Sequence, residues 1–194
     1  MYNKLGNTLR NEGKLTEAIA VYNQAIERDP QNIDAHRRLC AALQVQGPMA
    51  ETLDAARKLV ELNPGNADAY NVLAWLLVTV PIENGEYQDI DSAVSLAQNA
   101  CKLAPNNAGF WNTLGVAHYR AEQWQEVIAA MEESMELGVD HPTNWLFLAM
   151  AHQRQGNRDE AQHWYRKSIA WRGRKKLDAK LQSFYTEAAT VVEP

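Results

Sequence analysis

The chain has 194 residues, of which 46% are hydrophobic and 22% are charged, and its formal net charge at pH 7 is −5. This composition is that of a folded domain or a short array of small repeats, and it excludes a largely disordered or collagen-like chain. The mild negative charge argues against a DNA-coating protein. The longest apolar run, Val72–Val78, is far shorter than the roughly 20 residues of a membrane-spanning helix.

The N-terminal residues lack the apolar core of a signal peptide, so we expect a cytoplasmic protein that does not enter the membrane. The two cysteines, Cys40 and Cys101, lie far apart and belong to no CxxC motif or Cys/His cluster. A zinc site is therefore not expected. Two buried thiols fit a reducing compartment best, although a disulfide stays open at this point.

Helix-like segments recur along the chain and close at Pro30, Pro64 and Pro105. The first segment pair has large and small residues at fixed places: Tyr2, Leu5, Gly6 and Leu9, then Ala18, Tyr22 and Ala25. The same places recur in the second pair as His36, Leu39, Cys40, Leu43, Thr52, Ala56 and Leu59, and in the third as Tyr70, Leu73, Ala74, Leu77, Ala93, Ala97 and Ala100. The pattern predicts pairs of helices.

Two further helix pairs follow, and neither of them ends in a proline. The fourth has Trp111, Leu114, Gly115, His118, Val127, Met131 and Ser134, with Val139 in the place of the closing Pro. The fifth has Trp145, Leu148, Ala149, His152, Ala161, Tyr165 and Ser168, with Gly173 in that place. Five helix pairs in nearly one register are strong support for a repeat protein, whereas a single match to the pattern would be weak.

This spacing resembles the tetratricopeptide (TPR) repeat family. The resemblance implies one all-α TPR domain over residues 1–194, a right-handed superhelix of helical hairpins that ends in a capping helix at 177–192. The implied repeats are 1–32, 33–66, 67–107, 108–141 and 142–173. Small residues such as Gly6 and Gly115 let paired helices approach closely, and Gly13, Gly47 and Gly156 are expected in left-handed turns.

Two segments depart from the repeat pattern. Residues 81–91 form an insertion in the third repeat, read as a longer surface turn or as a loop that contacts a ligand, with Asp91 as a cap for the next helix. After Gly173, apolar residues at helical spacing predict the helix that closes the last repeat. Because Met1 falls inside the first helix, we expect the chain to be a part of a longer protein.

A narrower resemblance is to the TPR tails of large bacterial regulatory proteins, including planctomycete serine/threonine kinases. It is carried by Leu73–Trp75 with Thr79–Pro81, by Trp111–Ala121 and by Phe147–His152. None of these phrases is catalytic, and the sequence has no nucleotide-binding, hydrolase, metalloprotease or kinase motif. We expect no catalytic residue, no metal site and no cofactor. His118 and His152 are interpreted as packing residues.

The basic run Arg172–Lys176 is interpreted as a polar turn, or alternatively as a docking site for an acidic partner or for phosphates. No basic surface with interspersed aromatic residues extends through the repeats, so we expect no nucleic-acid binding. Which of the insertion and the basic run is functional stays open.

The TPR resemblance implies a concave groove lined by the first helix of each repeat. Carried onto this sequence, the predicted peptide-binding residues are Asn3, Asn7, Arg37, Asn71, Trp75, Asn112, Val116 and Tyr119. Asn side chains donate and accept hydrogen bonds and can pair with a peptide backbone, while the apolar members form a floor. Exposed Asn residues contribute little to folding, so Asn71→Ala and Asn112→Ala are expected to weaken binding and to leave stability nearly intact.

The predicted function is non-enzymatic: a protein–protein interaction module that binds a peptide or protein segment in this groove. The alternative is a structural module that docks onto the remainder of a longer chain or onto a second copy. The carboxylate clamp of chaperone-binding TPR domains is not expected, since Asn7 matches it but Asp68 and Val72 replace required basic residues.

Overall fold

The computed structural model describes residues 2–79, 89–173 and 175–193, and these ranges contain eleven α-helices and no strand. The all-α repeat fold predicted from the sequence is therefore confirmed. The chain forms two compact units, residues 1–73 and 74–194, called here the N-terminal and the C-terminal unit. The boundary falls within one helix, and each unit is described by itself.

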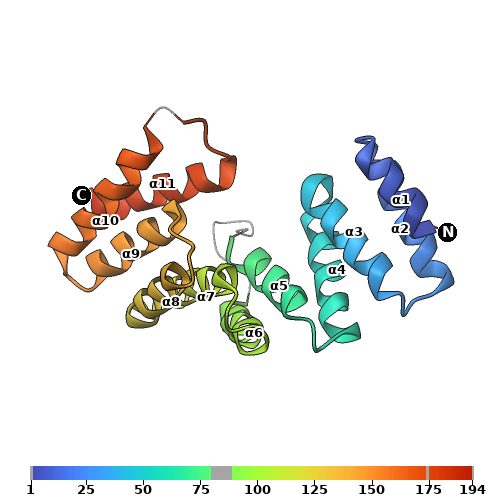
Figure 1. Cartoon of the computed structure of the whole chain (residues 1–194), viewed down its shortest axis with the longest axis horizontal. Coiled ribbons are helices and arrows are strands. Elements are labelled where there is room, and N and C mark those ends of the chain that lie inside the picture. Colours follow the sequence, from blue (N-terminus) through green and yellow to red (C-terminus); the bar gives the residue numbers. More distant parts are fainter. Residues whose placement is uncertain (1, 80–88, 174, 194) are drawn as a thin grey trace. The chain divides into compact units, whose positions relative to one another are not determined.

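The N-terminal unit consists of two helical hairpins and the beginning of a fifth helix (Figure 1). Its helices are α1 (Tyr2–Asn11), α2 (Leu15–Arg28), α3 (Ile33–Gln46), α4 (Met49–Leu62) and α5 (Ala67–Thr79) as far as Leu73. Each of α1 to α3 packs on the next helix in the chain, and α1 also contacts α3. This is the packing of stacked TPR hairpins, in which first helices form one layer and second helices the other.

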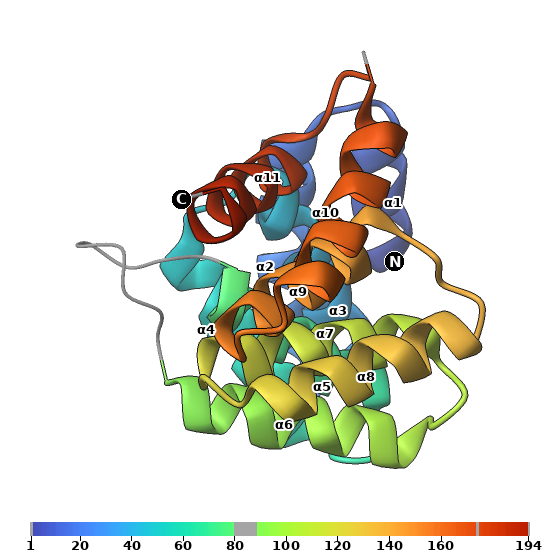
Figure 2. The same cartoon turned by 90° about the vertical axis from the view of Figure 1, so that its left-hand side faces the viewer.

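The C-terminal unit continues the same hairpins and ends in one additional helix. It comprises the rest of α5 and the helices α6 (Ile90–Leu103), α7 (Ala108–Arg120), α8 (Trp124–Glu136), α9 (Pro142–Arg154), α10 (Arg158–Arg172) and α11 (Ala179–Val192). Helices α6 to α10 each pack on the next, and α7 also contacts α9. Figure 2 shows α9, α10 and α11 side by side at the C-terminal end.

Small residues bring the paired helices together as the repeat pattern predicts. A Cβ atom at Gly6 would clash with the ring of Tyr22, which is fully buried between α1 and α2. A Cβ atom at Gly115 would lie 2.6 Å from Cε of Met131 on α8. Gly6 is therefore required by helix–helix contact, because the rigid Tyr22 ring cannot make room, whereas a side chain at Gly115 would displace the end of the flexible Met131 side chain.

The turns inside the hairpins confirm the prediction for two of three glycines. Gly13 and Gly156 have φ of +78° and +82°, in the left-handed region. Gly47 does not, because its φ is −87°. A Cβ atom there would lie 2.8 Å from Cα of Leu43, so close backbone approach explains Gly47 instead. In the fourth repeat Glu122 takes the left-handed position, with φ of +57°.

The insertion predicted at 81–91 falls mostly outside the described residues. The predicted cap Asp91 is wrong, because α6 begins at Ile90 and Asp89 caps it, with its Oδ1 accepting a hydrogen bond from the Ser92 amide at 3.3 Å. None of the helices in the described ranges is both long and apolar enough to cross a membrane.

Both cysteines are free and buried, as expected. Burial raises the pKa of the Cys40 thiol to about 11 and that of Cys101 to about 12, because a thiolate is poorly solvated in apolar surroundings. Both thiols are therefore protonated at neutral pH.

Candidate functional site

The eight predicted groove residues divide between the two units. Asn3, Asn7, Arg37 and Asn71 belong to the N-terminal unit, and Trp75, Asn112, Val116 and Tyr119 belong to the C-terminal unit. We call the surface of Asn3, Asn7, Arg37, Ala41 and Gln44 the N-terminal groove face. The surface of Trp75, Val116, Tyr119, Leu146 and Met150 is called the C-terminal groove face.

Polar side chains on the N-terminal groove face connect helices to one another. Asn3 donates from Nδ2 to Oδ2 of Asp34 at 2.9 Å, which joins α1 to α3. The Oδ1 atom of Asn7 accepts from the Tyr22 hydroxyl at 2.9 Å and from the guanidinium of Arg38. These two Asn residues therefore support the hairpin stack, whether or not they also meet a ligand.

Asp34 is the centre of this polar cluster. Its carboxylate accepts from Arg38 and from Arg37, each at 2.7 Å, in addition to Asn3. The hydrogen bond from Arg38 lowers the pKa of Asp34 most; burial opposes this shift, and Arg37 adds to it. Arg37 itself is exposed, so its guanidinium can also contact a ligand.

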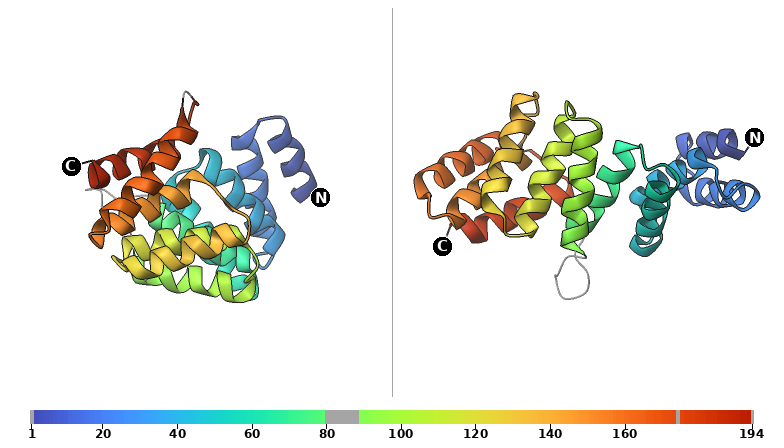
Figure 3. Two further views of the ribbon diagram at one scale, coloured as in Figure 1. Left: turned by 60° about the vertical axis from the view of Figure 1, so that its left-hand side comes forward. Right: turned by 90° about the horizontal axis from the view of Figure 1, so that it is seen from below.

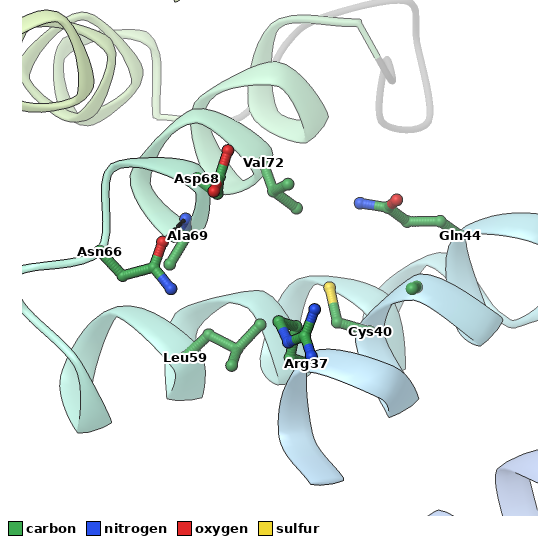
Figure 4. Close-up of a pocket in the computed structure, with 9 residues that line it drawn as sticks. Arg37, Cys40, Gln44, Leu59, Asn66, Asp68, Ala69 and Val72 are labelled. Atoms are coloured by element: carbon green, nitrogen blue, oxygen red, sulfur yellow. Dashed lines mark hydrogen bonds between the residues drawn. The ribbon is translucent and has the colours of Figure 1, made fainter. Parts of the chain in front are cut away.

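A hollow lies beside Arg37 on the same face. Its lining comes from α3 and α4 and from the first turns of α5 with the residue before them (Figure 4): Arg37, Cys40, Ala41, Gln44, Leu59, Asn66, Asp68, Ala69 and Val72. Its volume is about 110 Å³, smaller than the roughly 300–1,000 Å³ of pockets that enclose a drug-sized ligand. The hollow suits one side chain of a longer ligand. Sequence reasoning did not include Leu59 and Asn66 in the groove, because it took the groove residues only from the first helix of each repeat.

The C-terminal groove face differs, because it is covered by the chain itself. Val116 and Tyr119 are 0% and 6% exposed. Every residue from Pro142 to Ala151 on α9 is buried, and Leu146 and Met150 are both 0% exposed. The open apolar floor expected from Val116 and Tyr119 is therefore absent from this conformation. Their peptide-binding role stays a prediction.

The covering element is α11. Its Phe184 ring packs edge-on against Trp75 of α5 and Phe147 of α9, with centroids 6.2 and 5.0 Å apart. Lys180 places Nζ 4.9 Å from the Trp75 ring centroid and donates to Oγ1 of Thr79 at 2.9 Å. Trp75 is half-buried beneath these two side chains.

An ion pair anchors α11 to α7. The guanidinium of Arg120 forms two hydrogen bonds with the Glu187 carboxylate, one of them 2.8 Å long. Nε of the same guanidinium donates to the backbone oxygen of Val78 on α5 at 3.2 Å. The Arg120 side chain is only 5% exposed, and a charge so deeply buried requires a well-placed counter-charge.

The predicted closing helix therefore exists, and it packs on the last repeat as expected. It contacts chiefly α9 and to a lesser extent α10 (Figure 3). Its contact with α10 includes the Tyr185 hydroxyl, which donates to the backbone oxygen of Ser168 at 2.7 Å. The amphipathic pattern of α11 fixes that one side is buried, and only the fold decides that the partner is the groove side of α9.

Asn112 connects repeats instead of standing free. Its Nδ2 donates to Oδ1 of Asn144 at 2.9 Å, and Asn144, which is 0% exposed, donates to the Met131 backbone oxygen at 3.3 Å. The structure thus changes the expectation that Asn112→Ala leaves stability nearly intact. Asn71 is different, since its Oδ1 atom is buried and accepts no hydrogen bond from the described residues.

The other residues singled out in the sequence, His118 and two residues of the basic run, pack against neighbouring side chains. His118 is buried, with Nδ1 2.5 Å from Oε1 of Gln123. Across the described ranges, no group of three or more His, Cys, Asp or Glu residues is placed to hold a metal ion. In the basic run, Arg172 lies over the Tyr185 ring and Lys175 over the Trp171 ring, at 5.1 and 3.7 Å from their centroids.

Solved structures with the same fold are numerous. The crystal structure of MamA protein superposes with a TM-score of 0.76 at 20% identity, covering 91% of this chain and 95% of that one. YrrB, described as a TPR protein with an unusual peptide-binding site, gives 0.75 at 19% identity, covering 96% and 90%. A thermophilic TPR protein of Thermus thermophilus, TTC0263, gives 0.63 at 21% identity, covering 97% of each chain.

The sequence itself matches models of the TPR family. A model described as TPR repeat matches residues 6–47, and two described as tetratricopeptide repeat match residues 55–91 and 147–174. A search of curated proteins gives no match. The three matched segments together make up more than half of the chain, and the chain therefore belongs to the tetratricopeptide-repeat proteins.

Proposed function

We propose that this chain is a non-enzymatic protein-interaction module that binds an extended peptide or partner segment on its N-terminal groove face. The observation that carries the proposal is that Arg37, Ala41 and Gln44 project exposed from one side of α3 beside a hollow with an apolar wall. A guanidinium, an amide and a slot for one side chain are the elements with which a groove holds a peptide.

The size of the hollow supports a peptide over a small molecule, because the hollow is too small to enclose a drug-sized ligand. YrrB, which shares the fold, is described as having a peptide-binding site. That the chain is one part of a larger regulatory protein stays a prediction from the sequence.

The test uses a peptide selected from a displayed random library and synthesised with a fluorescent label. Arg37→Ala should weaken its binding about tenfold or more, because a hydrogen bond to a charged group contributes about 1.5–3 kcal/mol. Arg57→Ala on α4 is a matched control, since Arg37 and Arg57 are both exposed and each pairs with an Asp three residues earlier.

A second variant tests the hollow without changing charge. Ala41→Gln places a longer side chain at its edge and should weaken the same peptide while the melting temperature stays unchanged. Equal binding by the wild-type chain and both groove variants would show that the peptide binds elsewhere and would refute the proposed face.

A further inference from the structure

Helix α11 is a capped amphipathic helix. Asp178 caps its start by accepting a hydrogen bond from the Leu181 amide at 2.8 Å. One side is buried and the other is exposed. The buried side consists of Leu181, Phe184, Tyr185, Ala188 and Val192, and the exposed side includes Gln182, Ser183, Thr186 and Thr190. This division is the one by which an amphipathic helix binds in an apolar groove.

Three side chains of α11 contact the C-terminal groove face and the residues beside it, Thr79, Phe147 and Arg120, on three different helices. Lys180 meets Thr79 and Trp75 on α5. Phe184 fits between Trp75 and Phe147, on α5 and α9. Glu187 pairs with Arg120 on α7. The three lie at positions i, i+4 and i+7, which places them along one stripe of a helix.

From this arrangement we infer that the C-terminal groove face is a recognition surface for an amphipathic helix with a cation, an aromatic ring and a carboxylate at i, i+4 and i+7. Helix α11 occupies the surface within the chain, and a partner helix with the same pattern displaces it. This is a second surface, separate from the N-terminal groove face of the proposed function, and its residues are different.

Charge and burial define the partner's chemistry. Glu187 of α11 pairs with Arg120, whose side chain is 5% exposed, so a replacement helix with a carboxylate at the same position keeps this buried ion pair. Phe147 of α9 is fully buried and packs against Phe184, so the replacement helix must also be apolar at the position of Phe184.

Displacement is an exchange of one helix for another. Because α11 follows α10 after only residues 173–178, its effective concentration at the face is high, on the order of millimolar for a short link. An added helix therefore binds weakly while α11 is intact, and its apparent affinity rises as the internal helix is weakened.

The experiment titrates a fluorescent peptide of residues 177–193 into the full chain. Glu187→Gln in the chain should lower the dissociation constant for the peptide at least about tenfold relative to wild type, because the internal helix then loses its ion pair with Arg120. Thr186→Ala, one residue away on the exposed side of α11, is the matched control and should leave the dissociation constant unchanged.

A second variant keeps the experiment decisive if the Glu187→Gln chain fails to fold. Lys180→Gln loosens α11 from Thr79 and Trp75 while it leaves the Arg120–Glu187 pair in place, and it should also tighten binding of the peptide. A peptide that itself carries Glu187→Gln should bind the loosened chains at least about tenfold more weakly than the unchanged peptide, because it cannot form the ion pair with Arg120.

Three results would overturn the inference. The first is no peptide binding by either loosened chain while circular dichroism shows that it is folded. The second is equal binding by wild type and all variants, which would place the peptide elsewhere. The third is a dimer, detected by light scattering, whose subunits exchange α11, since the face would then belong to a second copy of the chain. None of these results bears on Arg37 or the N-terminal groove face.

Discussion

Asparagine residues that occupy the same position in different repeats have different roles in this protein. Asn3 and Asn112 each donate to a side chain on the first helix of the following repeat, Asp34 in one case and Asn144 in the other. Asn71, at the same position of its own repeat, has a buried oxygen that accepts no hydrogen bond from the described residues. The residue type alone therefore does not separate a support of the stack from a contact for a ligand.

Replacing Asn112 by Ala should lower the free energy of unfolding by about 1–3 kcal/mol, because the buried Oδ1 of Asn144 loses its donor. Asn99→Ala is the control, since Asn99 is exposed within α6 and Ala is the better helix former. Urea unfolding of both variants measures the difference. Equal midpoints for the two variants would show that the Asn112–Asn144 bond contributes nothing.

The cluster around Asp34 makes part of the stability depend on pH. The pKa of Asp34 is lowered in the folded chain, so its ion pairs stabilise the protein above the unfolded pKa of about 3.9 and are lost as the pH falls through the folded value. Asp34→Asn should cost less than about 1 kcal/mol at neutral pH, since the pairs are partly exposed to solvent.

Well below the folded pKa of Asp34, the variant and the wild-type chain should have the same stability, because both are then uncharged at this position. Urea unfolding at neutral and at strongly acidic pH checks this. A stability difference that stays constant with pH would mean that the charge on Asp34 is not the cause.

At the scale of elements, α11 shows how a terminal helix can finish a repeat array on its inner side. It buries Phe184 and Tyr185, which are 3% and 2% exposed, and it covers the groove side of α9. The Phe184 ring of α11 packs on the rings of Trp75 and Phe147.

Removal of residues 177–194 should make the chain aggregate or melt at a much lower temperature. It would remove Phe184 from its contacts with Phe147 and Trp75. Burial of one large apolar side chain is worth roughly 1.5–3 kcal/mol, against a total of about 5–15 kcal/mol for a domain. A chain that ends at Val192 is the control. Differential scanning calorimetry and light scattering provide the readout, and a truncated chain that melts like the control would show that α11 is not needed as a cover.

At the scale of the whole molecule, local stability should differ along the chain. In α9, all residues from Pro142 to Ala151 are buried, whereas α1 has only Gly6 buried and leaves Leu5 50% exposed. Amide exchange requires local opening, which is easiest where few apolar contacts must break. Hydrogen exchange followed by mass spectrometry should therefore find the slowest amides in α9 and fast exchange in α1. Equal protection of the two helices would contradict this.

Several features could be predicted from single residues, and others could not. The close approaches at Gly6 and Gly115 follow from the repeat pattern, because a helix pair tolerates only a small residue there. The cap at Asp89 was missed in favour of Asp91, since both precede the same apolar stripe and only the backbone decides which one starts the helix. The Asn112–Asn144 bond was missed because it joins residues of different repeats.

The sequence by itself determined the repeat register, the helical hairpins and the presence of a final helix, because these depend on local spacing of apolar, small and helix-ending residues. It also determined which side of each first helix carries the predicted groove residues. Only the tertiary structure decided which groove surface is open. The amphipathic pattern of α11 requires an apolar partner without naming one, and the pairing of Glu187 with Arg120 and of Phe184 with Trp75 joins residues far apart in the chain.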